Sequence, residues 1–220
     1  MPNSLNKSTI LRLARYFRVL QKLKTMGFVK VFSNNLGDAI GVTPSVVRKD
    51  FSLINLPGNK RGGYNIDTLL EQLAVILGKN RPHEVVLAGC GKIGTALMEY
   101  KEFAREGIRI IAGFDADPAR HRPDAPVPVY DIAELGPYVR EHGVQVGIIA
   151  VPDSAATQVL AVMQEAGIKG VLNFAPVELK GSGNCIIHNV NIGLEIETLF
   201  YLVTITNGIG AEIGSSDTAM

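Results

Sequence analysis

A glycine-rich hexapeptide in the middle of the chain has the residue types and spacing to bind phosphate groups. Its residues are Gly89, Cys90, Gly91, Lys92, Ile93 and Gly94. In such a G-x-G-x-x-G loop the first glycine permits a tight turn, and the second lets the backbone approach a pyrophosphate. The third lets the following helix pack on a sheet. The N–H groups at the start of that helix add partial positive charge, so the hexapeptide predicts a dinucleotide site.

The loop has the context that this use requires. An apolar segment at 85–88 predicts a strand before it, and a helix is predicted after it at 92–105. A second predicted strand, 108–114, ends beside Asp115, which lies 21 residues beyond Gly94. An acidic side chain there binds adenosine ribose hydroxyls and disfavours a 2′-phosphate, so the site favours NADH and NAD⁺. The alternative is a domain of this type whose loop is vestigial or used differently.

Two further segments follow the predicted strands 145–150 and 169–173. Ligands of open α/β sheets bind at the carboxyl ends of the strands. The side chains at these two ends are therefore candidates for the floor and wall of a nicotinamide pocket. They are Val151, Pro152, Asn173 and Phe174. The alternative is that they are ordinary strand ends.

A second set of residues is suited to DNA. Two short helices are predicted at 33–40 and 44–53, and the glycine-containing turn between them makes a helix-turn-helix. The exposed side chains of the second helix are predicted to be Ser45, Arg48 and Lys49. An arginine side chain can donate two hydrogen bonds to guanine, and a lysine side chain can bind a phosphate or a guanine. Alternatively, Arg48 only pairs with an acid of its own module, Asp50 or Asp38.

The glycine-rich segment 57–66 is unsuited to a helix and predicts a hairpin tip, or wing. It carries Lys60 and Arg61, which are followed by Gly62. Cations on such a tip suit a narrow minor groove, where negative potential is concentrated. These three residues are therefore predicted to contact DNA.

Charge is divided unevenly along the chain. The net charge of the whole sequence is +1, yet residues 1–82 carry 13 basic and 4 acidic side chains, a balance of +9. Residues 83–220 carry 9 basic and 17 acidic side chains, a balance of −8. A basic N-terminal module joined to an acidic C-terminal one indicates that the basic module binds a polyanion. The alternative is a solvated basic helix that contacts nothing.

The elements that must position these residues define the fold class. From residue 84, apolar strands alternate with helices, which is typical of a Rossmann-type, doubly wound α/β domain with a parallel sheet. The remaining predicted elements of that part are helix 131–142, helix 153–166 and strand 184–190. The domain limits that we predict are 1–80 for a winged-helix DNA-binding domain, 81–190 for a Rossmann NAD(H)-binding domain, 191–207 for an apolar C-terminal helix and 208–220 for a tail.

Composition excludes other classes of protein. No apolar run approaches the ~18 residues of a membrane helix, and the N-terminus lacks the apolar core of a signal peptide. The two cysteines, Cys90 and Cys185, are far apart and lack metal-type spacing. We therefore expect a cytoplasmic protein with no membrane partner, no disulfide and no metal site.

Residues for catalysis are missing. None of the four histidines follows a predicted strand end with an acidic partner, and no Ser-His-Asp pattern or Walker loop occurs. We therefore interpret the dinucleotide site as a sensor without catalytic residues. Two alternatives stay open: an NAD-dependent oxidoreductase with a helical N-terminal appendage, and a nucleotide-binding scaffold whose basic face binds a protein.

Taken together, these segments resemble the Rex family of redox-sensing transcriptional repressors over about residues 8–204. The matching segments are 15–20 (RYFRVL), 42–50 (VTPSVVRKD), 63–65 (GYN), 89–94 (GCGKIG), 114–118 (FDADP), 151–152 (VP) and 167–176 (GIKGVLNFAP). The combination is specific, although one segment alone is not.

The resemblance implies a homodimer that binds a palindromic operator through two winged helices. It implies that the C-terminal helix is swapped and packs between the two domains of the partner chain. It further implies that NADH favours a closed dimer that releases DNA, whereas NAD⁺ competes for the same site and leaves DNA bound. A basic residue after the Asp-Pro turn, here Arg120, is implied to approach the adenosine.

The resemblance also implies three residues that couple the domains. Arg18 and Tyr100 match the family's Arg and Tyr, but Asn191 stands where the family has Asp. An amide accepts a hydrogen bond without the charge that makes such a bond roughly twice as strong. We therefore expect weaker or differently wired redox gating. The wing differs too, because Lys60 and Arg61 lie one place later than in the family.

Overall fold

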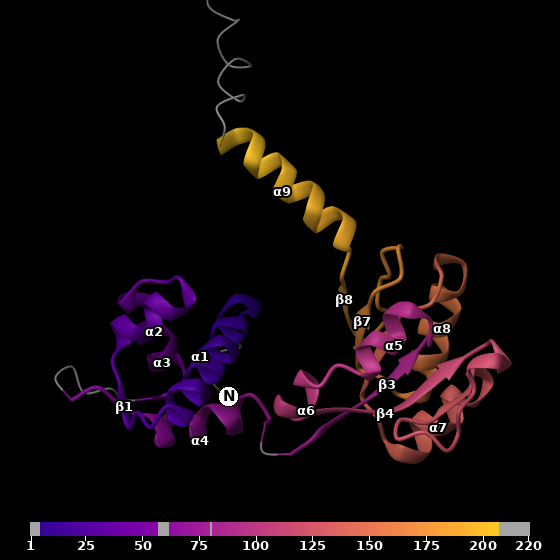
Figure 1. The fold of residues 1–220 in the computed structure, drawn as a ribbon, viewed down its shortest axis with the longest axis horizontal. Coiled ribbons are helices and arrows are strands. Elements are labelled where there is room, and N and C mark those ends of the chain that lie inside the picture. Colours follow the sequence, from indigo (N-terminus) through magenta and orange to yellow (C-terminus); the bar gives the residue numbers. More distant parts are fainter. Residues whose placement is uncertain (1–4, 57–61, 80, 207–220) are drawn as a thin grey trace, which may run out of the picture. The chain divides into compact units, whose positions relative to one another are not determined.

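A computed structural model of the chain describes residues 5–56, 62–79 and 81–206 (Figure 1). The chain divides into two compact units, which we call unit 1, up to His83, and unit 2, from Glu84 onward. The predicted domain border at 80/81 lies close to this division. Lys60, Arg61 and the predicted tail 208–220 lie outside the described residues.

Unit 1 contains four helices among its described residues and a two-stranded antiparallel sheet. Its elements are α1 (Lys7–Thr25), β1 (Lys30–Val31), α2 (Ser33–Ile40), α3 (Pro44–Leu53), β2 (Tyr64–Asn65) and α4 (Ile66–Ile76). Gly41 ends α2 with a φ of 73°, which suits the turn of a helix-turn-helix. Thr43 then caps α3 by accepting the Val46 amide. Leu13, Leu20 and Phe51 are fully buried in the core of the unit.

Unit 2 is built on a six-stranded sheet. Its strands are β3 (His83–Ala88), β4 (Ile108–Asp115), β5 (Val129–Asp131), β6 (Val146–Ile149), β7 (Gly170–Asn173) and β8 (Ile186–Asn189). They lie in the order β5-β4-β3-β6-β7-β8. Pairing is parallel for β4–β5, β3–β6, β6–β7 and β7–β8. In this doubly wound order the chain reverses direction across the sheet between β3 and β6, and such a switch point is where ligands bind.

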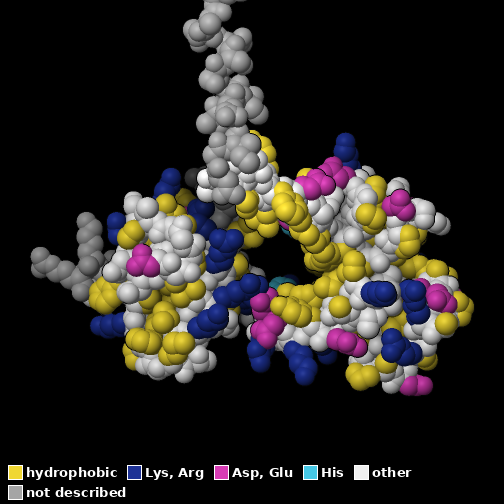
Figure 2. Space-filling view, turned by 45° about the horizontal axis from the view of Figure 1, so that its top comes forward, with side chains coloured by type: hydrophobic (Ala, Val, Ile, Leu, Met, Phe, Trp, Pro, Cys, Tyr) yellow, Lys and Arg dark blue, Asp and Glu magenta, His cyan; other side chains and the backbone are white. Residues whose placement is uncertain are grey.

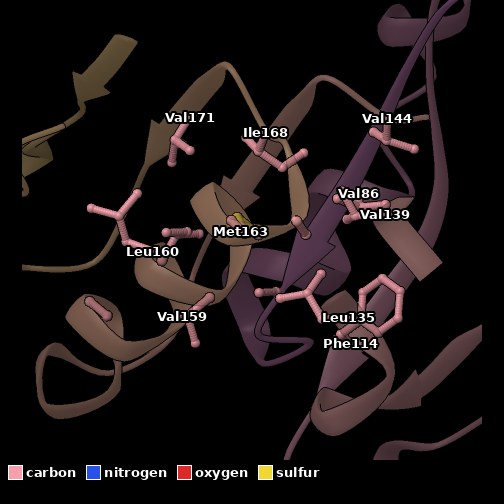
Figure 3. Close-up of a cluster of buried hydrophobic side chains, with 14 of the residues drawn as sticks. Val86, Phe114, Leu135, Val139, Val144, Val159, Leu160, Met163, Ile168 and Val171 are labelled. Carbon is pink, nitrogen blue, oxygen red and sulfur yellow. The ribbon is translucent and has the colours of Figure 1, made fainter. Parts of the chain in front are cut away.

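Helices cover both faces of this sheet. On one face, α7 (Leu135–His142) and α8 (Asp153–Ala166) supply Leu135, Val139 and Met163 to a buried cluster with Val86 and Phe114 (Figure 3). On the other face a second buried cluster holds the alternate β3 side chains, and α5 (Lys92–Met98) and α6 (Glu102–Arg105) pack against it. Burial on both faces explains why residues 85–88 are continuously apolar.

Three elements differ from their sequence prediction. The helix expected at 92–105 is broken into α5 and α6, and the break lets Phe103 pack against the second cluster. The short strand β5 was not predicted. The helix expected at 131–142 begins with a 3₁₀ turn, Ile132–Glu134, and becomes α-helical only at Leu135. Pro137 explains that start, because proline is tolerated only in the first turn of an α-helix.

The last described element is α9 (Ile192–Thr206). All of its residues are exposed, although nine of them are large and hydrophobic. Asn191 caps its start, since the Asn191 Oδ1 accepts the Leu194 amide at 3.1 Å. None of the helices in the described part of the chain has the length and hydropathy that a membrane span requires.

Candidate cofactor cavity and DNA-binding surface

A cavity of about 1080 Å³ opens at the carboxyl ends of the central strands of unit 2. Its lining includes Gly89 after β3, Asp115 at the end of β4, Val151 after β6 and Phe174 after β7. It therefore spans the switch point between β3 and β6. A volume of this size is large enough for a dinucleotide.

The glycines of the loop are required by its geometry. Gly89 has a φ of 94°, and a Cβ there would lie 2.5 Å from the Ala150 carbonyl oxygen. A Cβ on Gly94 would lie 1.9 Å from the Gly89 oxygen, so α5 packs where no side chain fits. At Gly91, by contrast, a Cβ would meet only the Arg120 Nη1, at 3.3 Å. The loop is thus tightly packed underneath and open toward Arg120 and the cavity.

Asp115 holds the loop in place. Its Oδ2 accepts the Cys90 amide at 2.6 Å and the Arg120 Nη1 at 3.1 Å, while its Oδ1 accepts the Asp117 amide at 2.9 Å. Burial by itself raises the pKa of Asp115, but these hydrogen bonds outweigh it, so the pKa lies below its usual value of 3.8. The carboxylate is therefore ionised at neutral pH and contributes negative charge to the cavity wall.

Arg120 and Cys90 lie on either side of this carboxylate and differ in burial and charge. The Arg120 guanidinium lines the cavity, half exposed, and also lies 3.5 Å from Asp117. Cys90 is buried, and burial together with the charge of Asp115 raises the pKa of its thiol to about 11. The thiol therefore stays protonated and acts as a packing group, whereas Arg120 is available to an anionic or polar ligand.

The other predicted cofactor residues divide into two groups. Those that line the cavity, besides the residues already named, are Lys92, Ile93 and Pro152. Cys90, Gly94 and Asn173 do not line it. Asn173 is fully buried, its Nδ2 donates to the Val177 carbonyl at 2.7 Å, and its Oδ1 accepts the Ala175 amide at 3.0 Å. The structure thus places Asn173 as a support for the loop after β7.

Sequence reasoning missed the apolar half of the cavity. It is formed mainly by apolar side chains from the 3₁₀ turn before α7, from the start of α7 and from α8, with the amide of Gln158 among them; the residues are Ile132, Leu135, Gln158, Val159 and Val162. These positions carry no motif, and their only signal is that helices which follow strands begin at the same edge of the sheet.

In unit 1, the three predicted DNA contacts of α3 are all exposed. Val47 and Phe51 of the same helix are buried, so α3 presents Arg48 and Lys49 outward. Among the described residues Arg48 forms no ion pair with Asp50 or Asp38, the alternative partners; its Nη1 donates to the Ser33 Oγ at 3.1 Å. Gly62 lies in a turn two residues before the start of β2.

Asp50 belongs to a buried network that the sequence did not reveal. It is 1% exposed, and Arg12 of α1 binds it with two hydrogen bonds, Nε–Oδ2 at 2.6 Å and Nη2–Oδ1 at 2.7 Å. The Tyr16 hydroxyl donates to the same Oδ2 at 3.1 Å. Hydrogen bonding to Asp50 raises the pKa of Arg12, and burial raises the pKa of Tyr16. The spacing of Arg12 and Tyr16, one helical turn apart, was the available signal.

Comparison with known proteins assigns both units. Residues 5–52 match the family "putative DNA-binding protein N-terminus", and residues 80–177 match the "CoA binding domain" family. The redox-sensing transcriptional repressor Rex of Desulforamulus reducens is 36% identical over 196 residues, which cover 89% of this chain and 93% of that protein. Rex 1 of Thermotoga maritima is 34% identical and covers 94% and 100%. The chain belongs to the Rex family.

Solved Rex structures agree with this membership. RSP in complex with β-NAD⁺ and operator DNA matches with a TM-score of 0.87 and 27% identity, over 96% of this chain and 98% of that one. RSP with β-NADH matches with a TM-score of 0.81 at the same identity, over 95% and 99%. The predicted fold class, a DNA-binding domain followed by a Rossmann-type domain and a C-terminal helix, is confirmed. Because Rex proteins are transcriptional repressors, the prediction that the chain is not an enzyme is confirmed as well.

The three residues implied to couple Rex domains are found in both units. Arg18 is exposed on α1 and lines a shallow hollow with Arg15 and Ile40. Tyr100, in unit 2, is 54% exposed and packs edge-on against Phe103, with ring centroids 5.1 Å apart. Asn191 caps α9, so its side-chain oxygen already accepts a hydrogen bond within its own helix.

Proposed function

We propose that this Rex protein is a homodimeric repressor that binds operator DNA through unit 1 and either NADH or NAD⁺ in the cavity of unit 2. NADH binding closes the dimer and releases the operator. The observation that carries this proposal is one chain with two sites, a G-x-G-x-x-G cavity at the switch point and a helix-turn-helix with outward cations. Complexes of RSP with operator DNA, β-NAD⁺ and β-NADH support it. Repression requires access to chromosomal DNA, so the proposed location is the cytoplasm.

In unit 2 the dinucleotide lies across the glycine-rich loop. The backbone at Gly91 and the start of α5 receive the pyrophosphate, because the space above Gly91 is open. Asp115 and Arg120 face the adenosine ribose, and the Asp115 charge disfavours NADP(H). Val151, Pro152 and Phe174 form the wall beside the nicotinamide. Cys90 and Gly94 shape the loop without lining the cavity, and Asn173 supports the loop after β7.

In unit 1 the helix α3 enters the major groove. Arg48 reads a base edge, Lys49 meets a phosphate or a guanine, and Ser45 contacts the backbone. The wing residues Lys60, Arg61 and Gly62 reach the minor groove. Two such surfaces in a dimer match a palindromic operator, since the symmetry of the protein is mirrored in its site.

The dimer rests on α9. A helix that is apolar on all sides is normally buried on all sides, yet every residue of α9 is exposed in a single chain. Figure 2 shows hydrophobic side chains gathered along this helix. Its exposed side chains include Leu199, Phe200 and Tyr201, each at least 60% accessible. Such a helix suits a swapped position between the two domains of a partner chain.

The effect of NADH on DNA binding is a coupling free energy between the two sites. NADH releases DNA only if it binds the DNA-incompetent arrangement more tightly. A 100-fold effect on operator affinity requires roughly 2.7 kcal/mol of coupling free energy, and by linkage DNA weakens NADH binding by the same factor. Arg18, Tyr100 and Asn191 are the proposed carriers. Asn191 lacks a charge, so the coupling is weaker than an aspartate would give.

The test is operator binding with NADH, with NAD⁺ and with neither. The operator is first selected by the chain itself from a pool of randomised duplexes, and a scrambled duplex of equal length and composition serves as the control. We expect NADH to weaken operator binding, NAD⁺ to leave it intact, and operator to weaken NADH binding by the same factor. Equal operator affinity at zero and saturating NADH would contradict the sensing proposal.

A further inference from the structure

A buried acid, Asp50, lies beneath the exposed basic residues of α3 that are proposed to bind DNA. Asp50 is 1% exposed, while Arg48 and Lys49, its immediate predecessors on α3, are exposed. A negative charge this close to cations that meet phosphates weakens their attraction to DNA. Electrostatics therefore gives Asp50 no favourable role in holding DNA, and its contacts must supply another.

Those contacts fix the carboxylate in both position and plane. Arg12 approaches it as a fork, with bonds of 2.6 and 2.7 Å to the two oxygens, and the Tyr16 hydroxyl adds a third bond of 3.1 Å. A bidentate arginine–carboxylate pair is planar and directional. Arg12 and Tyr16 are one turn apart on α1, so Asp50 ties α3 to two successive turns of that helix.

The junction continues on either side of Asp50. The Arg12 Nη2 also donates to the Oγ1 of Thr9, which is itself buried, at 3.1 Å. Phe51, the next residue of α3, packs edge-on against Tyr16 at 5.3 Å and against Tyr64 of β2 at 5.1 Å. One junction thus joins α1, the DNA-reading helix and the strand at the base of the wing.

We propose that Asp50 is a positioning residue for operator recognition: by fixing α3 on α1, it sets the direction in which Arg48 and Lys49 leave the domain. The inference rests on the proposed DNA-binding function. Base-edge contacts need a defined direction of approach, whereas phosphate contacts tolerate rotation of the helix. Loss of the Asp50 contacts therefore reduces discrimination between sequences and leaves general affinity for DNA in place.

The test compares Asp50→Asn with the matched variant Asp38→Asn. Asp38 is an exposed acid on α2, so both changes add one positive charge to unit 1. The full-length proteins are titrated with the selected operator and with its scrambled duplex at one salt concentration. We expect Asp50→Asn to weaken operator binding at least tenfold and to change binding of the scrambled duplex less than threefold. Asp38→Asn should change neither by threefold.

Thermal unfolding shows whether each variant is folded. The NADH affinity of each variant shows whether unit 2 is intact. If Asp50→Asn is folded and keeps the wild-type ratio of operator affinity to scrambled-duplex affinity, the inference is wrong. If unit 1 of Asp50→Asn is unfolded, both duplexes lose affinity equally because the variant is unstable. The Tyr16→Phe variant then becomes the deciding test of the inference. That variant keeps the ion pair and removes only one hydrogen bond, and it must lower the ratio at least threefold; an unchanged ratio overturns the inference. Failure of the wild-type chain to discriminate between the duplexes would instead overturn the proposed function.

Discussion

At the scale of single residues, Asp115 and Asn173 show where sequence spacing is informative and where it is not. Spacing placed Asp115 at the correct strand end, yet its bond to the Cys90 amide, 25 residues away, depends on how the loop folds. Asn173 was predicted to face the cofactor. Its partners Val177 and Asn189 come together only through the tertiary structure, and they occupy its side chain.

Asp115 makes the stability of unit 2 depend on pH. Because its pKa is lower in the folded protein than its usual 3.8, its ionised form stabilises the fold. That stabilisation is complete above pH 3.8 and is lost as the pH falls below that value. We expect Asp115→Asn to unfold at a lower temperature than wild type at pH 7, with the gap narrowing below pH 3.8. A gap that stays constant down to pH 2.5 would contradict the assignment.

Gly94 offers a sharper steric test. A methyl group there would lie 1.9 Å from the Gly89 carbonyl oxygen, so Gly94→Ala must displace either α5 or the loop. We expect at least a tenfold loss of NADH affinity with operator binding kept in the absence of NADH. Gly170→Ala is the matched control, because its nearest contact would be an ordinary 3.8 Å. Calorimetric titration with NADH measures both variants, and similar affinities for the two would count against the loop geometry.

At the scale of elements, the sequence was sufficient to predict helices that have a clear start signal and a regular apolar face. Helix 153–166 and helix 44–53 were predicted with their observed bounds, because each begins at a clear signal and has an unbroken apolar face. The strand β5 lies in a proline-rich stretch, so its three residues carry no readable alternation. The break between α5 and α6 accompanies the packing of Phe103 against the second buried cluster, a tertiary contact that the local sequence does not encode.

The cap of α9 makes Asn191 testable. Its Oδ1 accepts the Leu194 amide, so Asn191→Ala should cost about 1 kcal/mol of helix stability. Asn191→Asp keeps the cap and adds a charge that favours a helix N-terminus by about 0.3–1 kcal/mol. We expect Asn191→Asp to enlarge the effect of NADH on operator affinity. The measurement is the ratio of operator dissociation constants with and without NADH, and a ratio equal to wild type would separate Asn191 from the gating.

At the scale of the whole molecule, the charge division fixes how DNA binding responds to salt. Part of the basic charge of unit 1 is engaged internally, because Arg12 pairs with Asp50 and Lys24 with Asp67 at 2.7 Å. The 13 basic side chains of residues 1–82 therefore overstate the number of cations that reach phosphates. The exposed residues of α3 and the wing cations remain the main candidates.

Lys49 and Lys24 give a matched pair for this idea. Each released counterion contributes about −0.9 to the slope of log affinity against log salt. In a dimer, Lys49→Gln should make the slope shallower by about 2 units, while Lys24→Gln should leave it unchanged. Fluorescence anisotropy with the scrambled duplex between 50 and 300 mM salt, roughly the range in which such slopes are read, measures both. Equal slopes for the two variants would exclude Lys49 as a phosphate contact.

The assembly itself is tested at Phe200, a 70% exposed side chain on α9. A charge there cannot be enclosed between two domains without a partner. We expect Phe200→Glu to sediment as a monomer and to bind operator much more weakly, while Glu197→Gln on the same helix remains dimeric. Sedimentation that matches wild type would contradict a buried α9.

The uncovered apolar surface of α9 also has a consequence for the supply of active protein. A chain that meets no partner carries a helix with the character of a sticky, aggregation-prone segment. In the proposed dimer, folded stability rises with protein concentration, because pairing removes that surface from water. The proposed dimer therefore predicts that newly made chains at low abundance are the most vulnerable to proteolysis, so that the level of synthesis limits the amount of active protein.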